Sequence, residues 1–133
     1  PETQPIMMRL KSDITALCDA ALDGQLDQVS AEWDPRAALG VVMAAGGYPD
    51  SYRKGDVIEG LPEHAAADSH VFHAGTLLRY DGAVVTNGGR VLCVTALGDS
   101  VRLAQQRAYA ALQGIACEGA QYRRDIGHQA LKR

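Results

Sequence analysis

Residues 86–98 read TNGGRVLCVTALG, in which a glycine pair is followed by one arginine and a run of apolar residues. This order predicts a tight turn, a buried strand over residues 91–96 and then the start of a helix. Gly88 and Gly89 permit positive φ angles and a close approach of the backbone, both of which suit phosphate binding. Arg90 can hold a phosphate through two parallel N–H bonds. The alternative is a hairpin turn with a solvent-facing arginine.

The sequence before this turn predicts several strands. Residues 37–45, AALGVVMAA, are apolar without alternation, which is typical of a strand buried on both faces. That strand is expected to end in a turn at residues 46–49, GGYP, and the loop that follows contains a short extended piece at Val57-Ile58. Further strands are expected over residues 70–75, 76–80 and 83–86. Asp81-Gly82 lies between the last two and predicts a hairpin.

Helices are expected on both sides of these strands in the sequence. The clearest begins at Asp99 or Ser100 and closes at Gly114, because apolar residues recur at helical spacing between these ends. An earlier single helix is expected from Pro5 to Gly24. Its apolar stripe consists of Met7, Leu10, Ile14, Leu17, Cys18 and Ala21. The order helix, strands, helix indicates an α+β domain with a mainly antiparallel sheet and flanking helices.

The composition excludes several classes of protein. At 133 residues with 47% hydrophobic residues, the chain suits one domain with a modest core. The formal net charge of −3 and the lack of a basic face argue against a nucleic-acid partner. No run of 18 apolar residues exists, so we expect no membrane partner. Cys18, Cys93 and Cys117 form no CxxC pair, which favours reduced thiols in a cytoplasmic protein.

Other chemistry-bearing residues have simpler structural explanations. His70 and His73 form an HxxH pair, but residues three apart on a strand point to opposite faces and cannot easily share a metal. Cys93 lies inside a predicted strand, where a thiol is far more often inert packing than a nucleophile. Four candidate carboxylates are scattered along the chain, namely Asp56, Glu59, Asp99 and Asp125. Helix capping is a sufficient explanation for Asp99 and Asp125.

The tail offers a second group of cations. Arg123 and Arg124 could bring two further positive charges to an anionic site. The alternative, which we favour, is a short terminal helix that Asp125 caps and Ile126 packs, with both arginines in solvent.

Five stretches, taken in order, resemble one family. PETQP at residues 1–5 resembles the end of the RFGDPETQ signature of the phosphoribosylamine–glycine ligases, also called glycinamide ribonucleotide synthetases. LGVVMAAGGYP at residues 39–49 is similar to a segment of the same family. The other matching stretches are VFHAGT at 71–76, TNGGRVL at 86–92 and RDIG at 124–127. Together they cover essentially the whole chain.

The resemblance implies an ATP-grasp enzyme of purine biosynthesis. Such an enzyme joins glycine to 5-phosphoribosylamine and cleaves ATP to ADP and phosphate, with Mg²⁺ or Mn²⁺ as its metal. Residues 1–36 would be a helix and connection from the end of the ATP-grasp region, and residues 37–133 the C-terminal domain. The family's metal ligands are expected just upstream of Pro1, so no metal ligand and no strong ATP binding are expected in this chain. We expect the chain to be inactive by itself.

The resemblance also implies positions for the site. Arg90 would bind the ribose phosphate, with Gly88 and Gly89 as its backbone cradle. Several other residues are expected near the active site or along the same cleft. These are Glu2, Thr3, Gly46, Gly47, Tyr48 and Pro49. Arg124 and Asp125 would instead lock the C-terminal segment.

Two alternatives stay open at this point. The chain could be a non-catalytic module that supports a nucleotide-binding body or mediates contacts between chains, since its first apolar stripe needs a larger partner. It could also come from a different ATP-grasp ligase or carboxylase, although PETQP and GGYP argue against that.

Overall fold

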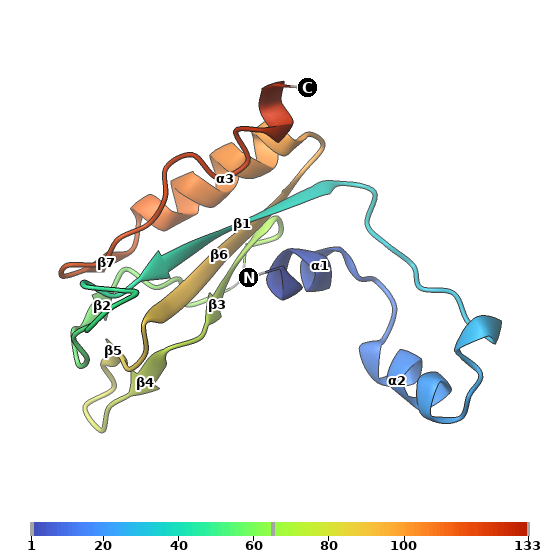
Figure 1. The fold of residues 1–133 in the computed structure, drawn as a ribbon, viewed down its shortest axis with the longest axis horizontal. Helices are drawn as coiled ribbons and strands as arrows, with labels where there is room; N and C mark the ends of the chain where they lie inside the picture. Colours follow the sequence, from blue (N-terminus) through green and yellow to red (C-terminus); the bar gives the residue numbers. More distant parts are fainter. Residues whose placement is uncertain (1, 65, 133) are drawn as a thin grey trace.

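The computed structural model describes residues 2–64 and 66–132, and its centre is an antiparallel sheet with the strand order β1-β6-β3 (Figure 1). Two small two-stranded sheets, β2-β7 and β4-β5, lie at one end of it. The elements in chain order are α1 (Thr3–Arg9), α2 (Ile14–Leu22), the 3-10 helix η1 (Leu26–Gln28), β1 (Ala37–Ala44), β2 (Ile58–Glu59), β3 (Ser69–His73), β4 (Thr76–Leu78), β5 (Val84–Thr86), β6 (Arg90–Gly98), α3 (Val101–Gln113), β7 (Ala116–Cys117) and the 3-10 helix η2 (Ala130–Lys132). This arrangement confirms the α+β fold with a mainly antiparallel sheet.

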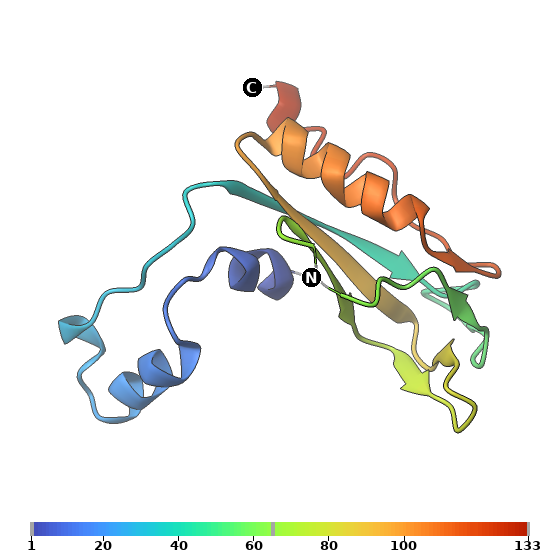
Figure 2. The same cartoon turned by 180° about the vertical axis from the view of Figure 1, so that it is seen from behind.

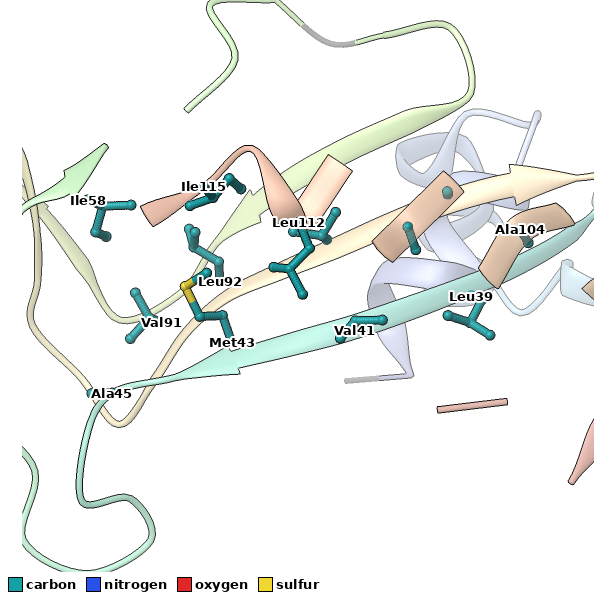
Figure 3. Close-up of a cluster of buried hydrophobic side chains, with 13 residues drawn as sticks. Leu39, Val41, Met43, Ala45, Ile58, Val91, Leu92, Ala104, Leu112 and Ile115 are labelled. Atoms are coloured by element: carbon teal, nitrogen blue, oxygen red, sulfur yellow. The ribbon is translucent and has the colours of Figure 1, made fainter. Parts of the chain in front are cut away.

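Helix α3 covers one face of the central sheet, and α1 packs on part of the other (Figure 2). Along β1, the side chains of Leu39, Val41 and Met43 are buried beneath α3, whereas Gly40 and Val42 on the opposite face are half-buried. The prediction of a strand buried on both faces is therefore wrong for β1, because α1 covers only part of its second face. Figure 3 shows how the buried side chains of β1, β6 and α3 interlock to form the core.

A β-bulge interrupts the pairing of β1 with β6 just after the glycine turn. Met43 lies opposite Leu92, but Ala44 lies opposite Arg90, so Val91 is an extra residue in β6. Val91 and Leu92 consequently both join the buried core. A bulge re-aims the side chains that follow it, and here it directs Arg90 to the half-open face instead of the core.

Helix α3 forms as predicted. The hydroxyl of Ser100 accepts a hydrogen bond from the N–H of Leu103 at 3.2 Å, which satisfies one of the free donors at the helix start. Ala104, Ala108 and Leu112 then recur on the buried face. The predicted hairpin at Asp81-Gly82 is also confirmed, since it joins β4 to β5.

The single helix predicted from Pro5 to Gly24 is wrong, because the chain breaks between α1 and α2. Leu10 leaves the helix in an extended conformation and forms an isolated bridge with Trp33. The carboxylate of Asp13 then accepts the N–H of Thr15 at 2.8 Å and starts a new helix. The apolar spacing runs through the break, so periodicity alone did not reveal it.

The terminal helix is shorter than predicted and lacks the predicted cap. It is a three-residue 3-10 helix at Ala130–Lys132, and the carboxylate of Asp125 binds the guanidinium of Arg123 instead. In the part of the chain that the structure describes, no helix is long and apolar enough to cross a membrane.

Candidate functional site

Arg90 lies at the start of β6, on the sheet face opposite α3, with its side chain exposed. In residues 2–64 and 66–132, its guanidinium makes no hydrogen bond or ion pair. Arg123 contrasts with it, since its guanidinium is held by Asp125 at 2.6 and 2.9 Å. The charge of Arg90 interacts with the carboxylate of Glu2, and because its guanidinium makes no hydrogen bond to the described residues, its N–H donors stay available to a ligand.

Arg90 lines a cavity of about 420 Å³. The outer face of β1 contributes an apolar surface to it, and the chain after β7 contributes a second wall. The lining residues are Gly40, Val42, Ala44, Tyr48, Arg90, Gln121, Tyr122, Arg123 and Ile126. The cavity thus combines an apolar surface, two tyrosines and two arginines. Such a mixture suits a small ligand with an anionic group.

A second cavity, of about 370 Å³, adjoins the first, because Arg90 and Val42 line both. It also brings Glu2 and Thr3, at the start of α1, to the same place as Arg90. Residues 2 and 90 are far apart in the sequence, and the packing of α1 against β1 and β6 joins them. The structure thus gathers three of the predicted site residues around one open groove.

The two glycines of the turn do not have the positive φ angles that the sequence suggested. Their role in the fold is close packing. A Cβ at position 88 would lie 2.9 Å from the Cα of Gly75, and one at position 89 would lie 2.4 Å from Cδ2 of Tyr48. Among the described residues, neither glycine N–H donates to a backbone carbonyl outside the regular elements. Gly89 is buried beneath the rings of Tyr48 and Tyr52, and neither glycine lines the two cavities beside Arg90.

The loop at residues 46–49 touches both the glycine turn and the C-terminal segment. The amide of Gln121 donates to the carbonyl of Tyr48 at 2.7 Å, and the N–H of Ala45 donates to the carbonyl of Gly89 at 2.8 Å. Of the four predicted loop residues, only Tyr48 lines the cavity beside Arg90. Gly46 instead packs against Gly119, where a Cβ would lie 2.9 Å from the carbonyl oxygen.

The C-terminal segment is fastened mainly by Tyr109 of α3. Its hydroxyl donates to the carbonyl of Arg123 at 2.7 Å and accepts the N–H of Ile126 at 3.1 Å. Hydrogen bonds from Arg123 hold the pKa of Asp125 below its usual range, so this carboxylate is charged at neutral pH. Arg124 is exposed and lies outside both cavities that Arg90 lines.

The other sequence candidates gain no functional support. His64, His70 and His73 line one cavity of about 340 Å³. Within residues 2–64 and 66–132, however, no group of three His, Cys, Asp or Glu side chains could hold a metal ion. Cys93 is buried beside Thr95, and burial raises the pKa of its thiol, which makes it a poor nucleophile.

Sequence reasoning missed the residues that complete the wall of the cavity. Gln121 and Tyr48 are 73 positions apart, and no motif links them. Gly40 and Val42 could have been found, because residues two apart on a strand share a face. The uniform apolar character of the strand concealed that alternation.

Comparison with known proteins gives concordant matches. Residues 38–129 match the family model described as "Phosphoribosylglycinamide synthetase, C domain". Phosphoribosylamine–glycine ligase of Escherichia coli O6:H1 is 61% identical over 133 residues, which is 100% of this chain and 31% of that protein. The protein of the same name from Vibrio parahaemolyticus is 59% identical over the same shares of both chains. The chain therefore spans about a third of the length of these curated relatives.

A solved structure agrees with the sequence matches. The crystal structure of phosphoribosylamine–glycine ligase from Thermotoga maritima superposes with a TM-score of 0.66 at 39% sequence identity. The match covers 83% of this chain and 27% of that chain.

Proposed function

The chain belongs to the phosphoribosylglycinamide synthetase family, and from this premise we propose that it forms part of a cytoplasmic ligase that makes glycinamide ribonucleotide. The proposed reaction joins glycine to 5-phosphoribosylamine in purine biosynthesis. ATP phosphorylates the glycine carboxylate, and the amine of 5-phosphoribosylamine then attacks the acyl phosphate. The new C–N bond forms as phosphate leaves, and ADP is the other product.

The observation that carries the proposal is the exposed guanidinium of Arg90, which lines two cavities and makes no hydrogen bond to the described residues. Arg90 would bind the phosphate of 5-phosphoribosylamine through two N–H bonds. The N–H groups of Gly88 and Gly89 come immediately before it in the chain and would supply further donors. These groups bind and orient the substrate, and none of them exchanges a proton in the reaction.

ATP and Mg²⁺ or Mn²⁺ are proposed partners of the longer protein, on the strength of the family resemblance. The residues that the structure describes include no group of three acidic, histidine or cysteine side chains able to hold a metal. Glu2 and Thr3 lie beside Arg90, and we propose that they border the site where the remaining groups would meet.

The test compares Arg90→Ala with Arg124→Ala in the full-length polypeptide. Both changes remove an exposed arginine, but Arg124 lines neither of the two cavities. Arg90→Ala should raise the KM for 5-phosphoribosylamine by about 10- to 100-fold, since a charge-assisted hydrogen bond contributes about 1.5–3 kcal/mol. Arg124→Ala should leave it unchanged. ADP release that depends on both glycine and 5-phosphoribosylamine is the measurement, and equal KM values in the two variants would refute the phosphate role of Arg90.

Residues 1–133 by themselves are proposed to be inactive. They correspond to 31% of the relatives' length, so most of the ligase would be missing from such a protein. The same ADP assay, run on the isolated chain with ATP and glycine, should give only the background rate. Release above background that depends on glycine would overturn this prediction.

A non-catalytic interaction module remains the second candidate, and the exposed apolar side chains near α2 favour it. Leu22, Leu26, Val29 and Trp33 are all exposed. Size-exclusion chromatography of the isolated chain separates the possibilities, because an exposed apolar surface promotes self-association. A clean monomer at all concentrations would argue against an interaction module.

A further inference from the structure

Tyr48 is held directly on the glycine turn that precedes Arg90. Gly89 is buried, and a Cβ there would lie 2.4 Å from Cδ2 and 2.9 Å from Cε2 of Tyr48. The ring therefore packs against the backbone of Gly89 where any larger residue would displace it. Tyr48 is 36% exposed and lines the same 420 Å³ cavity as Arg90.

Gln121 anchors the backbone of Tyr48. Its side-chain amide donates to the carbonyl of Tyr48 at 2.7 Å. Its backbone exchanges two hydrogen bonds with Ala44, at 2.8 and 2.9 Å, just before the loop begins. The N–H of Ala45 is bound in turn to the carbonyl of Gly89. The loop is therefore held by the turn and by the C-terminal segment together.

The hydroxyl of Tyr48 has no hydrogen-bond partner within residues 2–64 and 66–132, so it is available to a ligand. Val42 and Ala44 provide an apolar surface in the same cavity. A guanidinium, a phenol and an apolar surface together match the chemistry of a sugar phosphate. The guanidinium suits the phosphate, and the phenol suits a sugar that has both C–H faces and hydroxyl groups.

We propose that Tyr48 contacts the sugar ring of the sugar phosphate whose phosphate Arg90 binds, and that Gln121 is a positioning residue acting through Tyr48. This inference rests on the proposed function and extends it, because it assigns recognition of the sugar to a residue outside the glycine–arginine turn.

Tyr52 provides a matched control. Its ring also packs against Gly89, since Cε1 would lie 3.0 Å from a Cβ at that position. Tyr52 lines neither of the cavities beside Arg90. A purely structural role of ring packing on Gly89 would make the Tyr48→Leu and Tyr52→Leu variants behave alike. If Tyr48 instead recognises the sugar, only the Tyr48→Leu variant should bind the sugar phosphate more weakly.

The experiment uses the full-length polypeptide with two stable competitors of 5-phosphoribosylamine, ribose 5-phosphate and inorganic phosphate. Tyr48→Leu should weaken inhibition by ribose 5-phosphate by about 5- to 20-fold, the size expected for one hydrogen bond and one ring contact. Inhibition by inorganic phosphate and kcat should stay within about twofold of the parent. Tyr52→Leu should leave both competitors unchanged. Gln121→Ala should act in the same direction as Tyr48→Leu, with a raised KM for 5-phosphoribosylamine and an unchanged kcat.

Three results would overturn the proposal. They are equal effects of Tyr48→Leu and Tyr52→Leu, an equal loss of both competitors in Tyr48→Leu, and a change in kcat alone. Arg90→Ala tests the proposed function separately, since it should weaken both competitors. If Tyr48→Leu does not fold, Tyr48→Phe decides the matter, because it removes only the hydroxyl. We expect it to weaken ribose 5-phosphate about 2- to 5-fold, and no change would count against the proposal.

Discussion

The molecule has two regions that differ in how far their apolar side chains are buried. They are the N-terminal region, residues 2–36, and the sheet region, residues 37–132. The sheet region buries a continuous core, whereas no apolar residue of α1, α2 or η1 is buried. Leu22 is 86% exposed and Leu112 is 1% exposed, although both lie on amphipathic helices. Apolar spacing thus predicts which face of a helix is apolar, but the opposing surface decides whether that face is buried.

The largest expected contrast comes from shortening these two leucines. Leu112→Ala should lower the free energy of unfolding by about 2–5 kcal/mol, because it leaves a cavity in a close-packed core. Leu22→Ala should change it by less than about 0.5 kcal/mol, since an exposed side chain loses little on truncation. Urea unfolding of both variants measures the difference. A loss of stability in Leu22→Ala comparable to that in Leu112→Ala would mean that another surface covers α2 in solution.

The predictions made from the sequence also succeeded more often in the sheet region than in the N-terminal region. The positions of the longer strands and of α3 were predicted well, because apolar runs and caps such as Ser100 mark them, whereas the burial of β1 was mispredicted and the short strand β7 was missed. The break between α1 and α2 was missed, since it depends on the bridge from Leu10 to Trp33. Contacts between residues far apart in the sequence, like this one, leave no local pattern in the sequence.

The candidate site shows the same limit. Arg90 was predicted from its motif, but the bulge at Val91 that turns it toward the groove depends on the register with β1. The contact of Gln121 with Tyr48 spans 73 residues and could not be inferred. The glycines were predicted to cradle a phosphate, which stays a prediction, and the neighbours that the structure places against Gly88 and Gly89 are Gly75 and Tyr48 of the chain itself.

The ion pair between Arg36 and Asp68 joins the two regions, and Asp34 holds Arg36 in place from within the N-terminal region, so this cluster should respond to acid. Arg36 binds Asp34 at 2.7 Å, and it also binds Asp68, which Arg107 contacts at 3.0 Å. Hydrogen bonds from Arg36 hold the pKa of Asp34 well below its usual value of 3.8. Because the folded pKa is the lower one, the pair stabilises the folded chain above about pH 4 and loses that contribution as the pH falls through the folded pKa.

Asp34→Asn tests how much the pair of Asp34 with Arg36 contributes. It should destabilise the chain at pH 7 and flatten the decline in stability between about pH 4 and pH 2, since the variant has no carboxylate to protonate. Urea unfolding at several pH values, with Asp27→Asn as the control on the exposed η1, is the measurement. Parallel pH profiles for Asp34→Asn and the parent would show that other carboxylates dominate the acid response.

The smallest contrast compares two N-caps that make the same kind of bond in the two regions. Ser100 accepts the N–H of Leu103 at the start of α3, and Asp13 accepts the N–H of Thr15 at the start of α2. Removing a cap costs about 1 kcal/mol of helix stability.

Because α3 is part of the core, Ser100→Ala should lower the global unfolding free energy by about that amount. Because α2 has no buried residue, Asp13→Ala should fray the helix locally and leave the global transition in place. Hydrogen exchange of the α2 amides, measured with urea unfolding, distinguishes the two, and a shift of the global midpoint in Asp13→Ala would place α2 inside the cooperative unit.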